Sequence, residues 1–454
     1  MSAGGNQALK RLALRGSGVE LAGYGLSIVL RLGGNIVLSR LLFPKAFGLA
    51  AEVSFVLFGL AMLSDVGIRQ CVIQSPRGDE PDFLDTAFSM QVLRGAALTA
   101  LGLTLSVPAA LYWFREPELL PLLLAANFQN LILGFHSTSV LTLRRRLEVG
   151  WVNALELGQQ VVGLSVMIVW AKLHPSVWAL IGGTLAGATV YSLGSHFLPV
   201  GRKNRFRWDR SAYLEMSRFG RWIFGSSAVT FFASQGDRAL FGRYFGAKEL
   251  GVYQVAAELS NSAAAVVERL IAGVLYPLLS RARTERSPEE LTSIYYRARL
   301  ALDLFAQSAL GFLCAIGAWI VELIWDPRYW GAGSFLPMLC LRAATSCLVT
   351  PAECCLTSLG MPRYGFWRSL IRAVSVWLAL PIGFHFGGVP GMVWAVAVTE
   401  LPSLVLVWFR FRTLGMLRVG RELMAVAIFV AAYAVGSAIV PWLPEWHLPH
   451  GHAR

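Results

Sequence analysis

Apolar segments of about 20 residues recur along the whole chain, and this pattern constrains the fold more than any other feature. A helix rises about 1.5 Å per residue, so about 20 apolar residues cross the roughly 30 Å hydrocarbon layer of a bilayer. Of the 454 residues, 55% are hydrophobic and only 15% are charged, whereas a soluble domain carries about 25% charged residues. The sequence therefore predicts an all-α polytopic membrane protein.

Charges, prolines and glycines divide the apolar sequence into thirteen predicted transmembrane helices, within an expected range of about 12–14. The first of them is too long to be the apolar part of a cleaved signal peptide. The predicted spans are 18–42, 46–68, 86–114, 119–143, 150–172, 175–198, 220–242, 249–279, 298–325, 332–358, 365–387, 389–409 and 422–442.

The 40 Lys and Arg residues set the expected orientation. With the N-terminus inside, most of them fall in cytoplasmic connections, where basic residues are retained. We therefore expect a cytoplasmic N-terminus and, since the number of spans is odd, an outward C-terminal tail. The same distribution explains most of the net charge of +13. It indicates membrane lipids as partners and no nucleic acid.

One short phrase occurs twice, as SRLLFPKAFGLAAEV at 39–53 and as GRYFGAKELGVYQVA at 242–256. An offset of 203 residues superposes Lys45 on Lys248 (248 − 45 = 203) and the first two predicted spans on the seventh and eighth, and each half then holds six predicted spans. Because six is even, both halves run in the same direction through the membrane, as in transporters built from parallel repeats. The sequence thus predicts two six-helix lobes.

The expected organisation has five parts. They are a cytoplasmic N-tail (1–17), an N-lobe (18–200), a basic cytoplasmic linker (201–219), a C-lobe (220–410), and an extra C-terminal helix with an outward tail (411–454).

Charged residues inside the predicted spans point to a polar cavity. A charge at the bilayer centre costs at least ~2.5–3.5 kcal/mol, so it faces water or a partner. The planar guanidinium suits phosphate or carboxylate, and buried acids can bind and release a cation. The predicted anion contacts are Arg31, Arg94, Arg238 and Arg269, and the candidates for ion coupling are Asp65, Glu258, Glu268 and Glu353.

Polar residues at helical spacing on the predicted spans are expected to line the same cavity. The Ser and Asn side chains could instead form hydrogen bonds between packed helices. The acids could instead form structural ion pairs with Arg. The expected lining residues are Glu20, Tyr24, Ser27, Asn35, Asn127, Asn130, Glu156 and Asp237.

Signatures of catalysis are lacking in the sequence. No phosphate-binding loop, nucleophile motif or acidic pair on an outer loop is present, and the connections are too short for a catalytic domain. The six cysteines have no metal-ligand spacing with histidine. We expect no enzyme activity, no metal and no cofactor, apart from a coupling H⁺ or Na⁺.

The first copy of the phrase, followed by SDVGIRQCVIQ at 64–74, resembles the polysaccharide-transport branch of the MOP exporter superfamily. This branch comprises oligosaccharide and O-antigen flippases, and it is related to MATE multidrug exporters and to the lipid II flippase. The second half agrees, with GDRALFGRYFGAKELGVYQVA at 236–256 and VLYPLLSRA at 274–282.

The resemblance implies two six-helix lobes around a central cationic cavity. It further implies that undecaprenyl-diphosphate-linked oligosaccharide, for exopolysaccharide, capsule or O-antigen, is flipped across the bacterial inner membrane by ion-coupled alternating access. A glycan polymerase and export machinery are the implied partners. Members of the family commonly have twelve or fourteen spans, so the resemblance leaves open whether 411–454 holds one full span, half a span or two.

Two other functions are open to a chain of this kind. A MATE-like multidrug or cation antiporter would need an acidic and aromatic cavity. A membrane glycosyltransferase or glycan polymerase would need a sizeable outer loop, and none is predicted here.

Overall fold

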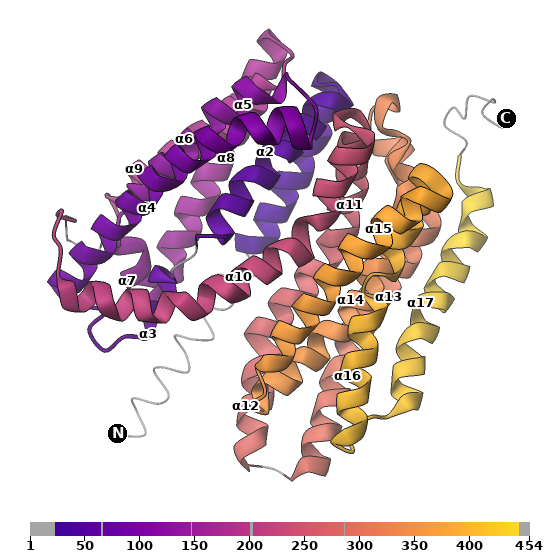
Figure 1. Ribbon diagram of the computed structural model, residues 1–454. Coiled ribbons are helices and arrows are strands. Elements are labelled where there is room, and N and C mark those ends of the chain that lie inside the picture. The colour runs from indigo at the N-terminus through magenta and orange to yellow at the C-terminus, as the bar shows by residue number, and fades with distance from the viewer. Residues whose placement is uncertain (1–22, 65–66, 147, 200–202, 286, 445–454) are drawn as a thin grey trace. The chain divides into compact units, whose positions relative to one another are not determined.

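The computed structural model describes residues 23–64, 67–146, 148–199, 203–285 and 287–444. Every regular element in these ranges is a helix (Figure 1), so the predicted all-α class is confirmed. The predicted site residues Glu20 and Asp65 lie outside the described residues, as does the N-tail 1–17.

The chain divides into two compact units, Met1–Leu250 and Gly251–Arg454. This division lies beyond the predicted linker 201–219. The first unit extends past this linker because residues 203–209 run along it, and α10 (Arg210–Phe245) then continues as one helix of 36 residues.

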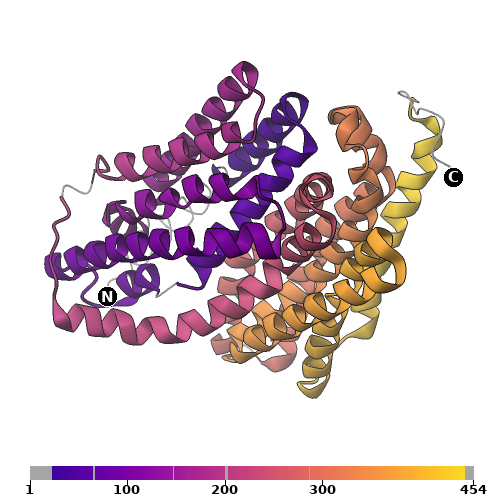
Figure 2. The same cartoon turned by 45° about the horizontal axis from the view of Figure 1, so that its top comes forward.

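The first unit contains a helix at 23–41 and the elements up to α10. In it α4 packs along α6, and α8 packs along α9 (Figure 1 and Figure 2). Its other elements are α2 (Pro44–Met62), α3 (Ile68–Gln74), α4 (Pro81–Pro108), the π-helix η1 (Ala109–Trp113), α5 (Leu119–Ala126), α6 (Phe128–Gly134), α7 (Ser139–Arg145), α8 (Val149–Leu173) and α9 (Trp178–Ser195).

The second unit is built around α13, which packs against both α14 and α17. Its elements are α11 (Ala247–Leu270, which begins in the first unit), the π-helix η2 (Ile271–Leu275), α12 (Tyr276–Glu285), α13 (Pro288–Ile324), the 3-10 helix η3 (Pro327–Tyr329), α14 (Ala332–Ser358), α15 (Arg363–Val398), α16 (Leu401–Thr413), α17 (Val419–Ile439) and the 3-10 helix η4 (Val440–Trp442).

Among the described residues, fewer separate helices meet the length and hydropathy of a membrane span than the thirteen predicted. Within the described ranges, eight helices are long and apolar enough to cross a membrane, or nine if the bent pair Leu119–Gly134 and Ser139–Arg145 is one span. The predicted spans 175–198 and 220–242 correspond to α9 and α10, which do not qualify. Small polar residues and glycines lower the mean hydropathy of α9, and arginines lower that of α10.

Two more predicted spans, 365–387 and 389–409, fall in one apolar stretch, Arg363–Thr413. The boundary predicted between them is nevertheless a real kink, because Gly388 has φ 56°, a conformation that glycine adopts without strain. A second break at Thr399–Glu400 was not predicted, and it separates α15 from α16.

The doubled phrase marks equivalent helix starts. α2 begins at Pro44 and α11 begins at Ala247, and the two starts are 203 residues apart (247 − 44). The two copies also touch: a methyl group at Gly48 would lie 1.5 Å from the carbonyl oxygen of Ala247. Glycine at 48 therefore permits the close approach of these two helix starts.

Candidate functional site: a cavity in the first unit

A cavity of about 390 Å³ lies within the first unit. Its wall is formed mainly by α2, α6, α9 and α10, and most of it is aliphatic. Among the described residues that line the cavity, Arg238 is the one charged side chain and none is acidic. The polar lining consists of Ser54, Gln129, Asn130, Thr184, Gln235 and Arg238.

One face of α10 supplies the cationic part of the cavity. Gln235 and Arg238 are three residues apart, so they lie on the same face of the helix. Arg238 Nη1 donates a hydrogen bond to Gln235 Oε1 at 2.7 Å, which holds the guanidinium toward the cavity. Asp237 is half-buried, and its Oδ1 accepts from the backbone N–H of Arg238 at 2.9 Å. It is not among the cavity's lining residues.

The amides of Gln129 and Asn130 reach the cavity because the chain breaks between α5 and α6 at Asn127. Asn127 is fully buried, and its amide donates to Leu123 O at 2.8 Å and to Ser106 Oγ at 3.2 Å. It therefore joins α5 to α4 and does not line the cavity. This is the helix-to-helix bonding that the sequence left open as an alternative.

The lining chemistry favours an anionic ligand that carries hydroxyl groups. A guanidinium donates to phosphate or carboxylate, and the three amides can both donate and accept. The Thr184 hydroxyl donates to Leu180 O at 2.8 Å, so its remaining lone pairs can accept from a ligand. The volume falls within the range of roughly 300–1,000 Å³ that is typical of small-ligand sites.

The predicted polar face of the first helix packs largely against α8. Ser27 Oγ donates to Gln160 Oε1 at 2.7 Å, and Gln160 Nε2 donates to Ser27 O at 2.8 Å. Tyr24 and Asn35 on this helix are half-buried, whereas Arg31 is exposed. These contacts tie two helices of the first unit together.

Glu156 on α8 is exposed and forms a short ion pair with Arg144 at the end of α7. The pair lies outside the 390 Å³ cavity. Glu156 thus balances the charge of Arg144 at the end of the neighbouring helix α7.

Arg94 on α4 makes its described hydrogen bonds at the carboxyl end of α2. Its Nη2 donates to Ala61 O at 2.7 Å and to Ser64 Oγ at 3.0 Å, and its Nε donates to Ser64 Oγ at 3.1 Å. A cation at this position satisfies terminal carbonyls and interacts favourably with the helix dipole.

The second unit holds a cluster of buried and half-buried charges on α14, on α15 and at the start of α16. Arg368 pairs closely with Glu353, and Arg372 Nε lies 3.0 Å from Glu400 Oε1. Arg368 Nη2 lies 4.0 Å from Glu400 Oε2. Arg342 is buried and donates to Asn261 Oδ1 at 2.9 Å. The predicted coupling residue Glu353 is thus half of an ion pair.

The remaining predicted residues of the second unit lie on α11. Glu258 and Arg269 are half-buried, and Glu268 is exposed. Ser262 Oγ donates to the backbone carbonyl of Glu258 at 2.7 Å. None of these three side chains lines the cavity of the first unit.

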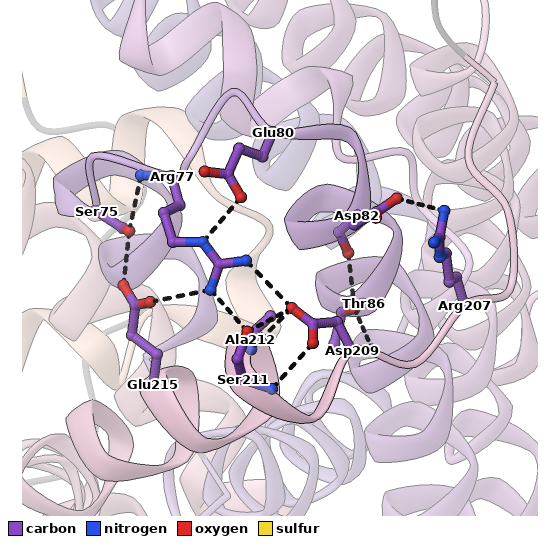
Figure 3. A network of polar contacts seen from close by, with 10 residues as sticks. All are labelled: Ser75, Arg77, Glu80, Asp82, Thr86, Arg207, Asp209, Ser211, Ala212 and Glu215. Carbon is purple, nitrogen blue, oxygen red and sulfur yellow. Dashed lines mark hydrogen bonds and ion pairs between the residues drawn. The ribbon is translucent and has the colours of Figure 1, made fainter.

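The extended segment 203–209 is fastened to the first unit by polar contacts (Figure 3). The backbone N–H of Asp209 donates to Thr86 Oγ1 at 3.0 Å, and Arg77 Nη2 lies 3.2 Å from Asp209 Oδ2. Arg77 also pairs with Glu80 at 2.8 Å, and this hydrogen bond raises the pKa of Arg77. The hydroxyl and backbone N–H of Ser211 lower the pKa of Asp209 to about 2.

Several polar residues of these sites were not predicted. Gln129, Thr184 and Gln235 escaped because single amides and hydroxyls in apolar helices carry little signal. Arg368 and Arg372 are four residues apart on α15, and this spacing could have placed them on one buried helix face. Glu400 immediately precedes α16, and the proline at position 402 is a sequence signal for the start of that helix.

Comparisons with known proteins agree on the family. Residues 37–331 match the family described as "Polysaccharide biosynthesis protein". The chain is 26% identical over 400 residues to the succinoglycan biosynthesis transport protein ExoT of Rhizobium meliloti (strain 1021), covering 83% of this chain and 75% of that protein. It is 20% identical over 345 residues to the teichuronic acid biosynthesis protein TuaB of Bacillus subtilis (strain 168), covering 75% and 70%.

Solved structures show the same fold. The lipid II flippase MurJ in an inward closed conformation superposes with a TM-score of 0.71 at 12% identity, covering 92% of this chain and 98% of that one. An inward-facing multidrug resistance MATE transporter of the MOP superfamily superposes with a TM-score of 0.67 at 15% identity, covering 91% and 96%. The chain therefore belongs to the polysaccharide biosynthesis protein family, as a multi-pass membrane transporter with the MOP-superfamily fold and not as an enzyme.

Proposed function

We propose that the protein flips an undecaprenyl-diphosphate-linked oligosaccharide from the cytoplasmic to the periplasmic leaflet of a bacterial inner membrane. The cargo is a repeat unit of an exopolysaccharide, a capsule or an O-antigen. Transport proceeds by alternating access, with the N-terminus in the cytoplasm and with a cation gradient as the driving force. A glycan polymerase and export machinery then receive the flipped unit.

The observation that carries this proposal is the charge of the cavity in the first unit. Arg238 is the charged group among its described lining residues, and it stands among amides and hydroxyls. A diphosphate accepts hydrogen bonds from a guanidinium, and sugar hydroxyls exchange hydrogen bonds with amides. A cavity of about 390 Å³ has room for part of a headgroup, while the lipid tail stays in the bilayer.

The proposal also includes the other predicted anion contacts, whose described surroundings differ from one another. Arg94 makes its described hydrogen bonds to the end of α2, which favours a structural role. Arg31 and Arg269 are proposed to meet the headgroup during passage, since a guanidinium suits a diphosphate. Glu258, Glu268 and Glu353 stay candidates for coupling, and the pairing of Glu353 with Arg368 supports a structural alternative for that residue.

A deletion strain complemented with variants tests the function. We expect the deletion to remove surface glycan and to leave lipid-linked repeat units accessible only from the cytoplasmic side. Wild type and Arg238→Lys should restore export, the latter partly, whereas Arg238→Gln at equal membrane abundance should not. Full export by Arg238→Gln would remove Arg238 from the binding site.

The same strain separates the flippase from a multidrug or cation antiporter. An antiporter for cationic drugs is expected to bind them with acidic groups, and none of the cavity's described lining residues is acidic. We therefore expect drug sensitivity to be unchanged by the deletion. Raised drug sensitivity together with normal surface glycan would overturn the proposed cargo.

A further inference from the structure

Glu52 on α2 is a fully buried carboxyl group without a hydrogen-bond partner. Its exposed fraction is 0%, and neither of its side-chain oxygens has a partner among the described residues. Buried acids are ordinarily paired or hydrogen-bonded, since an unpaired charge in an apolar interior is costly. Glu52 lies within the first copy of the doubled phrase, yet the proposed cavity does not use it.

The surroundings of Glu52 are apolar on both sides of α2. The neighbouring residues Leu49 and Val53 belong to a buried hydrophobic cluster that includes Phe114. At Gly242 on α10, a methyl group would lie 2.8 Å from the Phe114 ring and 3.1 Å from Glu52 Oε1. The carboxyl group and the Phe114 ring thus both lie close to Gly242, where the second copy of the phrase begins.

Two charged groups act on Glu52, and they are engaged with each other. Lys45 lies on α2, and Glu116 follows the π-helix η1. Lys45 Nζ lies 3.8 Å from Glu116 Oε2 and 2.9 Å from Glu118 Oε2, so its cation is matched by two other carboxylates. The residue of α10 that lies next to the Glu52 carboxyl group is Gly242, which has no side chain.

These surroundings favour the neutral carboxylic acid over the carboxylate. Burying a carboxylate without a partner costs several kcal/mol, and the group avoids this cost by holding a proton. A metal cation is a poor alternative, because hard cations require several oxygen ligands. No group of three or more His, Cys, Asp or Glu residues suited to a metal occurs among the residues that were described.

We propose that Glu52 is a proton-binding site of the transport cycle and that the driving ion is H⁺. In the described state the carboxyl group holds its proton, because water does not reach it. When α2 and the end of α10 separate, water reaches the group, and the proton leaves as the carboxylate forms. The binding of one proton from the other side restores the acid. The coupling part of this inference rests on the proposed flippase function, whereas the protonation of Glu52 does not.

Infrared difference spectroscopy on the full-length protein in lipid tests the protonation without any substrate. At pH 7 we expect the C=O stretching band of a protonated carboxyl group in wild type, lost in Glu52→Gln and kept in the matched control Glu148→Gln. Glu148 is exposed and immediately precedes α8 in the same unit, and it is not one of the groups that act on Glu52. An identical band in Glu52→Gln would overturn the assignment.

Proteoliposomes test the coupling with a fluorescent undecaprenyl-diphosphate-linked glycan as the probe. Wild type and Glu148→Gln should flip the probe faster when an imposed pH gradient drives protons through the protein. Glu52→Gln, a mimic of the protonated state, should exchange the probe between leaflets at equilibrium but gain nothing from the gradient.

Glu52→Asp keeps the acid and is expected to retain part of the acceleration. Acceleration of Glu52→Gln by the pH gradient, or acceleration of wild type by a sodium gradient instead, would overturn proton coupling at this residue. An absence of flipping in wild type would contradict the proposed function, and the infrared result would still decide the protonation of Glu52.

Discussion

Arg299 on α13 and Glu422 on α17 form a buried two-pronged ion pair that ties the last helix to the second unit. Arg299 Nη1 and Nη2 donate to the two carboxylate oxygens of Glu422, the second at 2.8 Å. Arg299 Nε donates to Asp303 Oδ2 at 3.1 Å, and the Trp408 indole donates to Glu422 Oε2 at 3.1 Å. The exposed fractions of Arg299 and Glu422 are 1% and 3%. The C-terminal helix is thus an integral part of this unit.

Removal of one partner of this pair should destabilise the protein strongly. Glu422→Ala leaves the buried cation of Arg299 with Asp303 alone, and we expect a loss of about 3–5 kcal/mol. Thermal unfolding in detergent, followed by size exclusion, measures the change. The control is the triple variant Arg299→Met/Asp303→Leu/Glu422→Leu, which leaves none of the three paired charges alone and should be closer to wild type. Wild-type stability of Glu422→Ala would refute the role of this pair.

Glycine at position 48 should be required by the close approach of α2 to the start of α11. Gly48→Ala places a methyl group 1.5 Å from the carbonyl oxygen of Ala247, and backbone atoms cannot yield cheaply. We expect destabilisation of at least about 1–3 kcal/mol. Gly33→Ala is the matched control, because nothing lies within 4 Å of a methyl group there. It should be neutral or stabilising by up to about 1 kcal/mol. Equal thermal midpoints for the two variants would count against this packing.

Arg94 should act mainly on stability. Arg94→Gln removes charged hydrogen bonds to the end of α2, and we expect a loss of about 1–3 kcal/mol. Export per folded molecule should then stay near that of wild type. Arg94→Lys keeps the cation at the helix end and should lose less. If Arg94→Gln kept full stability but lost export, the predicted contact with the anionic headgroup would be supported instead.

Asp209 should hold the start of α10 at every physiological pH. Its Oδ1 and Oδ2 accept from the backbone N–H groups of Ser211 and Ala212 at 3.0 and 3.2 Å. The pKa of Asp209 is lowered to about 2. Its stabilisation is therefore present above the unfolded pKa of about 3.9 and is lost as pH falls through about 2.

Hydrogen exchange measures this cap. Amides in the first turn of α10 should exchange faster in Asp209→Ala than in wild type at pH 7, and Asp209→Ser should restore protection because serine also caps helices. Protection in wild type should stay level between pH 5 and pH 8, once the intrinsic exchange rate is removed. Equal exchange in wild type and Asp209→Ala would show that the cap is dispensable.

Hydrophobicity and internal repetition predicted much of this architecture. The offset of the doubled phrase matches the starts of α2 and α11, and the boundary predicted at residue 388 is the kink at Gly388. Of the predicted site residues, Arg238 and Asn130 line one cavity. Helical periodicity was sufficient for these, because it places residues on a face and at a depth.

Periodicity does not say which neighbour a face meets, and the remaining differences follow from this. Asn127 is at the predicted depth, yet it bonds across helices, and Arg94 turns to the end of α2. Glu52 lies inside the predicted span 46–68 and was overlooked, because the sequence does not show which acid of a span the packing buries. Within Arg363–Thr413 the division at Gly388 was predicted, whereas the break at Thr399–Glu400 was missed because it lies inside one apolar stretch.

The central claim is that the cavity around Arg238 binds the anionic headgroup of a lipid-linked glycan. Flipping of a fluorescent undecaprenyl-diphosphate-linked glycan in proteoliposomes, followed by access of a membrane-impermeant quencher, tests it most directly. Arg238→Gln should flip the probe roughly 10- to 100-fold more slowly than wild type, as expected for the loss of a charged hydrogen bond, with Arg238→Lys between them. Wild-type flipping by folded Arg238→Gln would contradict the claim.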